Sequence, residues 1–392
     1  MTGPSPLEAF RAHLRPGMTV ALGDGVGVLG RLVDGTSVCE ALSNAASEVG
    51  DVKLVVGWLP EPADGLDAQS FARVTVLMPG GGARRLMQSQ ATHFVPGRFS
   101  AWPALLTGRL KPELLITRVV EHAGELHFGS EVSYQRALIE AGVPVLAVVD
   151  EATPKASAEP PLSPDQVVII GRSACGPAQH HREPDPLHEA LADSVLRFIP
   201  AGTRIQYGPG PLGTALLRRA QVPLIVDTGL LTDAVIDLER RGLLCGTPSA
   251  TYLTGTDEFY DWADGQPILH GVEYTHDLTR LSRGLPFMAV NTAVEIDPVG
   301  QINAEGRGDK LIGGIGGHPD FCAAGRMHPR GLSIIATPSV VNGHSPLVDQ
   351  LSRPASTPAS DVDLIVTENG YADLRDADWP LRRRRIAELF GV

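Results

Sequence analysis

The sequence is poor in the residues that mark several common classes of protein. Only 4 of its 392 residues are cysteine, and they are scattered without CxxC spacing. This argues against a disulfide framework and suits a reducing compartment. The 33 basic residues are outnumbered by 45 acidic ones, and the formal net charge is −12. Such a charge opposes general binding to nucleic acid or to an anionic membrane.

Long apolar runs are also missing. No window of about 18 residues is free of charges, proline and glycine. The opening residues MTGPSPLEAF lack the basic and apolar regions of an export signal. The aromatic content of 5% does not favour a large stacking pocket. We therefore expect a globular cytoplasmic protein without a membrane span or a signal peptide.

Short apolar runs alternate with amphipathic segments along the chain, which is typical of an α/β protein with largely parallel strands. The expected strands are Thr19–Leu22, Val52–Val56, Val74–Met78, Leu114–Val120, Val145–Val149, Val167–Ile170, Arg204–Tyr207, Leu224–Asp227, Phe287–Asn291, Ser333–Ala336 and Val362–Thr367. The expected helices are Ser37–Val49, Tyr134–Ala141, Asp185–Phe198, Leu212–Ala220, Asp233–Arg241 and Leu381–Phe390. Ser37 and Glu40 have capping-box spacing at the first of these helices.

The length of the chain is enough for about two domains. A turn at residues 199–202 follows a segment rich in proline, glycine and histidine. We predict a boundary at this turn, with one α/β domain over residues 1–199 and a second over residues 200–392. The histidines of HHREPDPLH (180–188) stand among prolines and charges, which favours a solvated loop, so we expect no metal site.

Four motifs follow one another in the last part of the chain: NTAVEID (291–297), GGIGGHPDF (313–321), GLSIIATPS (331–339) and VTENGYADLR (366–375). In this order they resemble the C-terminal domain of the acetyl-CoA hydrolase/transferase family, class I CoA-transferases that include the 4-hydroxybutyrate and succinate/acetate CoA-transferases. The segments 94–108 and 116–134 resemble first-domain segments of the same family. The resemblance implies two open, largely parallel-sheet domains of the CoA-transferase type, with an acyl-CoA site between the domains.

Two glycine-rich loops are candidate contacts to the acyl-CoA, with Gly208, Gly210 and Gly213 in the first and Gly314, Gly316 and Gly317 in the second. The first loop joins a predicted strand to a predicted helix, where backbone N–H groups and the helix dipole can face an anion or a carbonyl oxygen. A plain tight turn is the alternative. In the family, similar loops line the thioester and supply oxyanion donors.

Four polar residues are further candidates for the active site. Asn291 ends a predicted strand, and the matching asparagine of the family faces the active site; a side chain that ties down a loop is the alternative. Glu295 and Asp297 share one face of a strand and could fix the loop or face the site. Glu368 stands in TENG, beside Gly370. Its place matches a different family element from the one that carries the nucleophile, so we keep it as a secondary candidate.

The catalytic glutamate of the family is missing. In the family it belongs to a strand-end motif of the kind Thr-Glu-Met-x-Ser-Asp-Gly, followed by Asp-Leu and a glycine. The corresponding run here is DTGLLTDAVIDLERRG (227–242), in which Thr232–Asp233, Asp237–Leu238 and Gly242 align without a gap. This register puts Gly229 at the position of the glutamate. Glycine can neither attack the thioester nor hold CoA as an acyl thioester.

Three functions are compatible with this departure. We favour hydrolysis of a CoA thioester, or of a carbon–carbon bond in a CoA-linked diketone, by water that a carboxylate activates. Asp227 is the first choice for this base, followed by Asp233, Glu295 and Glu368. The second function is a CoA-transferase with a relocated carboxylate nucleophile, and the third is a non-catalytic acyl-CoA-binding protein or subunit.

The chemistry implied by the resemblance also sets the expected ligands and partners. Coenzyme A, as an acyl-CoA, is expected as the substrate, together with a carboxylic acid if the protein is a transferase. We expect no bound cofactor. We expect a homo-oligomer, a dimer, with a second subunit that supplies the carboxylate as the alternative.

Overall fold

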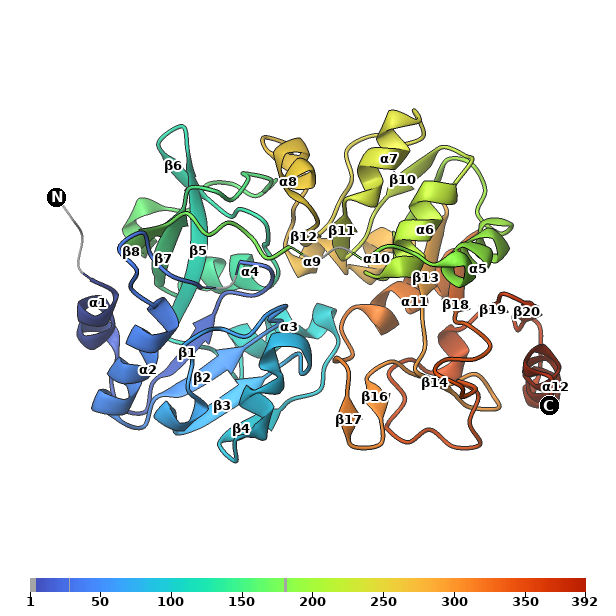
Figure 1. Ribbon diagram of the computed structural model, residues 1–392, viewed down its shortest axis with the longest axis horizontal. Coiled ribbons are helices and arrows are strands. Elements are labelled where there is room, and N and C mark those ends of the chain that lie inside the picture. The colour runs from blue at the N-terminus through green and yellow to red at the C-terminus, as the bar shows by residue number, and fades with distance from the viewer. Residues whose placement is uncertain (1–4, 28, 180–181) are drawn as a thin grey trace. The chain divides into compact units, whose positions relative to one another are not determined.

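The computed structural model describes residues 5–27, 29–179 and 182–392, which form two compact units (Figure 1). The first unit comprises the described residues up to Gly97, those from Ala101 to residue 179, and Thr251–Glu273. The second comprises Arg98–Ser100, the described residues up to Ala250, and Tyr274–Val392. The compact units therefore divide the chain differently from the boundary expected between residues 199 and 200.

Packing explains why the segment before residue 200 belongs to the second unit. Helix α5 (Pro186–Leu196) packs beside α6 (Pro211–Arg219). The Arg219 Nε lies 2.6 Å from the Asp193 Oδ1, which joins the two helices by an ion pair.

Hydrogen bonds explain why Thr251–Glu273 returns to the first unit. The Tyr252 hydroxyl donates to the buried Asp24 carboxylate. The Leu253 N–H donates to the Ser130 carbonyl oxygen at 2.9 Å. A segment far along the chain thus completes the hydrogen bonding of the first unit.

The first unit is built on a sheet of strand order β4-β3-β2-β1-β5-β7-β8, in which all of these neighbours pair in parallel. Its strands are β1 (Thr19–Leu22), β2 (Lys53–Val56), β3 (Arg73–Val76), β4 (Thr92–Phe94), β5 (Leu114–His122), β7 (Val145–Asp150) and β8 (Val167–Ser173), and β6 (Glu125–His127) is antiparallel to β5. Its other elements are α1 (Pro6–His13), α2 (Val38–Val49), α3 (Trp102–Thr107), α4 (Gln135–Glu140), β12 (Tyr252–Thr254) and α8 (Asp257–Ala263).

The second unit is built on a sheet of order β10-β9-β13-β18-β19-β20, parallel except for β20. These strands are β9 (Thr203–Tyr207), β10 (Leu224–Val226), β13 (Phe287–Asn291), β18 (Leu332–Ala336), β19 (Leu364–Thr367) and β20 (Gly370–Asp373). Short strands are β11 (Leu230–Thr232), β14 (Glu295–Ile296), β15 (Ile302–Asn303), β16 (Gly306–Arg307) and β17 (Lys310–Leu311). Further helices are α7 (Ala234–Arg240), α10 (Leu278–Leu281), α11 (His318–Met327) and α12 (Trp379–Phe390), and α9 (Val272–Thr275) begins in residues of the first unit and ends in residues of the second.

Single turns of 3₁₀-helix complete the element list, at Ala68–Ser70, Gly81–Arg84, Leu86–Gln88, Phe99–Ala101, Pro164–Gln166 and Ala359–Asp361.

The predicted α/β fold class is confirmed, and every predicted strand and helix is present with ends shifted by a few residues. The central strands explain why the prediction worked. In β7 every residue is buried, as expected for a parallel strand covered on both faces. Helix α2 begins after Ser37, whose hydroxyl oxygen accepts a hydrogen bond from the Glu40 N–H at 3.2 Å.

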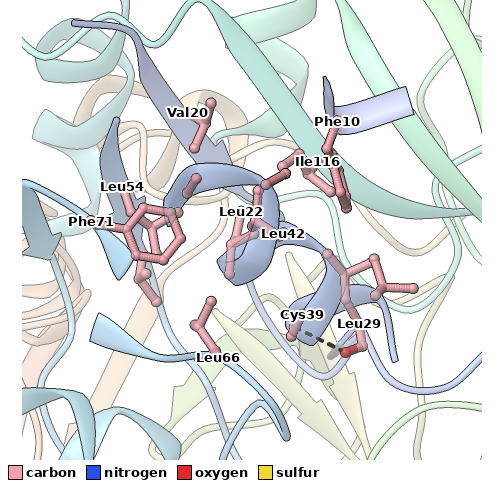
Figure 2. Close-up of a cluster of buried hydrophobic side chains, with 14 of the residues drawn as sticks. Phe10, Val20, Leu22, Leu29, Cys39, Leu42, Leu54, Leu66, Phe71 and Ile116 are labelled. Atoms are coloured by element: carbon pink, nitrogen blue, oxygen red, sulfur yellow. Dashed lines mark hydrogen bonds between the residues drawn. The ribbon is translucent and has the colours of Figure 1, made fainter. Parts of the chain in front are cut away.

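The core of the first unit lies between its sheet and the helices α1 and α2. Figure 2 shows Leu42 of α2 beside Leu22 of β1, with Phe10 of α1 near Ile116 of β5. These side chains come from segments distant in sequence, and their burial holds the helices on the sheet. The same cluster contains Cys39, whose thiol donates to the Leu29 carbonyl oxygen at 3.3 Å.

Candidate active site

The carboxyl ends of the parallel strands in the second unit form one edge of its sheet, and the candidate site lies at this edge. The chain runs from β9 through α6 to β10 on one side, and from β13 through α11 to β18 on the other. Because these crossovers diverge, the topological switch point lies between β9 and β13. Open α/β sheets bind ligands outside the carboxyl ends of their strands at such a point.

The first predicted glycine loop lies at this switch point, directly after β9. The Gly208 N–H donates to the Val290 carbonyl oxygen of β13 at 3.1 Å. A Cβ at Gly208 or Gly210 would meet open space, whereas one at Gly213 would come within 2.4 Å of the Gly208 carbonyl oxygen. No side chain caps the N-terminus of α6 in the described structure. The loop therefore leaves the positive end of α6 able to face a carbonyl oxygen or an anion.

Asn291 ends β13 at the same switch point, but its side chain has partners within the fold. Its Nδ2 donates to the Gln206 Oε1 at 3.0 Å, and its Oδ1 accepts from the Gln206 Nε2 at 3.2 Å. Both side chains are buried. This reciprocal amide pair ties the ends of β9 and β13 together, which favours the alternative interpretation of Asn291 as a structural side chain.

Asp227 follows β10 and is held by a buried ion pair. The Arg280 guanidinium donates to both of its carboxylate oxygens at 2.8 Å, and the Arg204 Nη1 lies 3.5 Å from its Oδ2. The geometry is that of a structural anchor for the end of β10. It argues against Asp227 as the general base.

The two candidate glutamates also stabilise loops. Glu295 accepts hydrogen bonds from the Asn303 Nδ2 and from the Ser352 N–H and hydroxyl at 2.8–2.9 Å. Burial raises the pKa of Glu295, but the Ser352 and Asn303 hydrogen bonds outweigh it and the net pKa is lowered. Glu368 accepts from the Ser339 N–H at 2.9 Å and also from the Ser339 hydroxyl. Both carboxylates are thus engaged by their neighbours.

Gly229 itself lies in a tightly held loop. The Thr228 hydroxyl donates to the Tyr207 carbonyl oxygen at 3.1 Å, and the Thr232 N–H donates to the Tyr207 hydroxyl at 3.2 Å. Gly229 is partly exposed between these anchors. A Cβ at this position would lie 3.3 Å from the His276 Nε2 and 3.3 Å from the Phe321 ring. The backbone that would carry the glutamate therefore faces a histidine.

The second predicted glycine loop reaches the same histidine. Gly316 has a left-handed φ of 60°, and its carbonyl oxygen accepts from the Phe99 N–H at 3.1 Å. A Cβ at Gly317 would lie 2.3 Å from the His276 Nε2, so only glycine fits there. Two glycines of predicted importance, Gly229 and Gly317, thus both lie beside the Nε2 of His276.

His276 was not predicted from the sequence, because it belongs to no recognisable motif. It is buried, and its ring lies 5.1 Å from that of Phe99 and 4.6 Å from that of Phe321 between ring centres. Its Nδ1 shares a hydrogen bond of 2.8 Å with the Thr275 hydroxyl. Burial, and then the Arg280 charge, lowers the pKa of His276 to about 3. The imidazole is therefore neutral near pH 7.

The segment Arg98–Ser100 contacts both the second glycine loop and α11. The Ser100 hydroxyl donates to the Asp320 Oδ1 at 2.6 Å, and the Ser100 N–H donates to Oδ2 at 3.2 Å. Burial raises the pKa of Asp320 to about 6. These contacts hold Phe99 against His276.

The histidine-rich segment 180–188 is described only in part. His180 and His181 lie outside the described residues, and the His188 Nδ1 lies 2.6 Å from the Asp185 Oδ1. Within the described chain, no group of three or more histidine, cysteine or acidic side chains could hold a metal ion. Among the helices formed by the described residues, none is both long and apolar enough to cross a bilayer.

Comparisons with known proteins show what the chain is similar to. Residues 255–389 match the model of the acetyl-CoA hydrolase/transferase C-terminal domain. The chain is 25% identical to the 4-hydroxybutyrate coenzyme A transferase of Clostridium kluyveri over 82% of its own length and 80% of that protein. It is 29% identical to the acetyl-CoA hydrolase of Candida albicans over 55% of its length and 45% of that protein.

Solved structures show the same fold. RipA from Yersinia pestis superposes with a TM-score of 0.86 at 20% identity, covering 99% of this chain and 94% of RipA. A 4-hydroxybutyrate CoA-transferase from Porphyromonas gingivalis superposes with a TM-score of 0.75 at 20% identity, again covering 99% of this chain and 94% of that one. Residues 255–389 thus carry the C-terminal domain of the acetyl-CoA hydrolase/transferase family, and nearly the whole chain shares the fold of these solved structures.

Proposed function

We propose that this enzyme hydrolyses the thioester of an acyl-CoA by direct attack of water, without a covalent intermediate on a carboxylate. The family relationship supports an acyl-CoA substrate. The proposal rests on Gly229, the position that the resemblance aligns with the family's glutamate. A Cβ there would face His276 and Phe321.

The engagement of the other carboxylates argues against transfer through a relocated nucleophile. A carboxylate nucleophile has to approach the thioester carbon and form a mixed anhydride. Asp227 is held by Arg280 on both oxygens, and Glu368 is held by Ser339. Either would have to leave a buried or part-buried hydrogen-bonded position before it could attack, which carries a free-energy cost.

The binding side of the proposal rests on the two glycine loops. The loop with Gly208, Gly210 and Gly213 precedes the uncapped end of α6, which favours a carbonyl oxygen or a phosphate. The loop with Gly314, Gly316 and Gly317 precedes α11. In the reaction, water adds to the carbonyl carbon and the carbon–sulfur bond breaks. The thiolate of CoA leaves and takes up the proton that the water loses.

The test is incubation of the purified protein with a panel of acyl-CoAs, with and without acetate or succinate, followed by mass spectrometry of all CoA species. Free CoA formed without an acceptor is the expected result. A new acyl-CoA formed only with an acceptor would establish a transferase instead. Binding without any turnover would establish a non-catalytic acyl-CoA-binding protein, and cleavage of a CoA-linked diketone alone would move the reaction to a carbon–carbon bond.

A further inference from the structure

One buried nitrogen of the second unit has no partner in the fold. The His276 Nε2 has negligible exposure to solvent and forms no hydrogen bond with any described residue. Buried polar atoms nearly always have a partner, because leaving one without a hydrogen bond destabilises the protein. An unpaired ring nitrogen therefore calls for a group that the folded chain does not supply.

The surroundings of this nitrogen show where such a group can come from. Phe99 and Phe321 cover the ring with apolar carbon. Two partly exposed glycines stand beside Nε2, because a Cβ built on Gly229 would lie 3.3 Å from it and one built on Gly317 would lie 2.3 Å from it. The absence of side chains at these two positions leaves an approach to Nε2 from their side. Any side chain at Gly317 would close it, since the Cβ would come within 2.3 Å of Nε2.

We propose that His276 donates a hydrogen bond from Nε2–H to the carbonyl oxygen of the acyl-CoA thioester, between Gly229 and Gly317. This inference rests on the proposed function and names a catalytic residue for it. As the nucleophile adds to the carbonyl carbon, the carbonyl π pair moves onto the oxygen, and the N–H stabilises that charge. The pair returns to re-form the carbonyl when the thiolate leaves.

The neighbours of the ring favour a donor rather than a base. The Thr275 hydroxyl lies 2.8 Å from Nδ1, and when it donates to Nδ1 the ring proton resides on Nε2. Thr275 is then a positioning residue. The low pKa of His276 agrees with this role, because a weak base is poorly matched to removing a proton near pH 7, whereas a neutral imidazole can polarise a carbonyl.

Three variants separate the roles open to His276. His276→Phe keeps a planar ring and removes both nitrogens, and kcat is expected to fall about 100-fold with a small change in KM. His276→Gln keeps an N–H near the position of Nε2 and is expected to recover most of the loss. A base would be lost equally in both. His328→Phe is the matched control, because His328 is another buried histidine of the same unit and uses both ring nitrogens in the fold. It should leave kcat within about threefold, allowing for its cost in stability.

A second readout does not depend on turnover. The probe is an acyl-CoA analogue in which a methylene group replaces the thioester sulfur and the ketone carbon is labelled with ¹³C. Its carbonyl infrared band is expected to shift to lower wavenumber on binding to the wild type and to His276→Gln, and to shift less on binding to His276→Phe.

The outcomes remain distinguishable from those of the proposed function. Equal band shifts and equal kcat in wild type and His276→Phe would overturn the role of His276 while hydrolysis stands. Loss of activity in His276→Gln as large as in His276→Phe, with equal band shifts, would replace the donor by a base. If no free CoA is released but the band shift is larger in the wild type than in His276→Phe, hydrolysis would be overturned and the contact of His276 with the carbonyl group would be supported. A protein that binds no acyl-CoA would overturn both.

Discussion

At the scale of single residues, Gly229 is the position on which the proposed chemistry depends most. Gly229 has no side chain, yet the loop around it is anchored by Thr228 and Thr232 to Tyr207. The position is therefore held in place although glycine offers no nucleophile. Its φ is not left-handed, so a side chain is compatible with the backbone.

Restoring the carboxylate tests whether the rest of the transferase site survives. In Gly229→Glu the new Cβ has to displace His276 and Phe321 by a few tenths of an ångström. We expect acceptor-dependent formation of a new acyl-CoA to rise at least about tenfold over the wild type, because a carboxylate nucleophile is again available. Mass spectrometry of the CoA species measures it. Gly229→Gln is the control of equal size, and an equal rate in both variants would show that the carboxylate adds nothing.

The ion pair of Asp227 gives a second prediction for a single side chain. Arg280→Met leaves the Asp227 carboxylate buried with only Arg204 nearby. We expect the free energy of unfolding to fall by about 3 kcal/mol, since removing one partner leaves a poorly compensated buried charge. Urea unfolding measures this. Arg11→Met breaks the exposed pair with Glu48 and should cost less than about 1 kcal/mol; similar losses in both variants would contradict the structural role.

At the scale of elements, the capping-box spacing marks the start of two helices, of which only one was predicted. The spacing of Ser37 and Glu40 predicted α2, and the same spacing at Ser5 and Glu8 precedes α1, where the structure has a complete capping box. Helix α1 was not predicted, although this spacing marks its start. Helix α11 was not predicted, because it directly follows the glycine-rich residues 313–317 and its first residues were assigned to the same loop.

The last helix shows how packing overrides a charge pattern. The run of four arginines from residue 382 to 385 favours a solvated face, yet Arg382 is buried. Its guanidinium donates to the carbonyl oxygens of Ala359 at 2.6 Å, Val299 at 3.0 Å, and Val362 and Leu374 at 3.2 Å. It thus joins α12 to the loops beneath it.

Removing this arginine should therefore destabilise the second unit. We expect Arg382→Met to lower the free energy of unfolding by about 3 kcal/mol, because several buried carbonyl groups lose their donor. Arg384→Met, two residues along the same helix and exposed, should change it by less than about 0.5 kcal/mol. Urea unfolding of both variants measures the change in the free energy of unfolding. Equal changes would mean that the Arg382 contacts add no stability.

At the scale of the whole molecule, buried acids and histidines should set opposing dependences of stability on pH. Burial raises the pKa of Asp320 to about 6, above its ordinary value of 3.8. The folded state then binds a proton more tightly than the unfolded state, so this group lowers stability as pH rises from 4 to 6. Burial lowers the pKa of His276 to about 3, below 6.5, so this group lowers stability as pH falls from 6.5 towards 3.

Single variants expose each contribution. The stability of Asp320→Asn relative to the wild type should rise between pH 4 and 6, and that of His276→Phe should rise as pH falls below 6.5. Each slope should be at most about 1.4 kcal/mol per pH unit. The urea midpoint measured between pH 4 and 7.5 reports both. Parallel curves for a variant and the wild type would show that the group titrates normally.

The sequence predicted the fold well and the site in part, for a physical reason. Apolar runs and turn residues are local, so β9, β13 and the loop of Gly208 could be located along the chain. Ion pairs and ring contacts join distant segments. The pairing of Asp227 with Arg280 and the approach of His276 to Gly229 depend on how α9 and α10 fold back, which no local pattern encodes.

The order of the chain through its two units has a consequence for synthesis. Residues 181–250 belong to the second unit and leave the ribosome before Thr251–Glu273, which complete the first. Asp24 therefore remains without its Tyr252 partner until more than half of the polypeptide has emerged. Multidomain chains usually fold one domain at a time from the N-terminus, whereas here the first unit is complete only after part of the second has been made. The first unit remains incomplete until Thr251–Glu273 have been synthesised, and by then the synthesis of the second unit has begun.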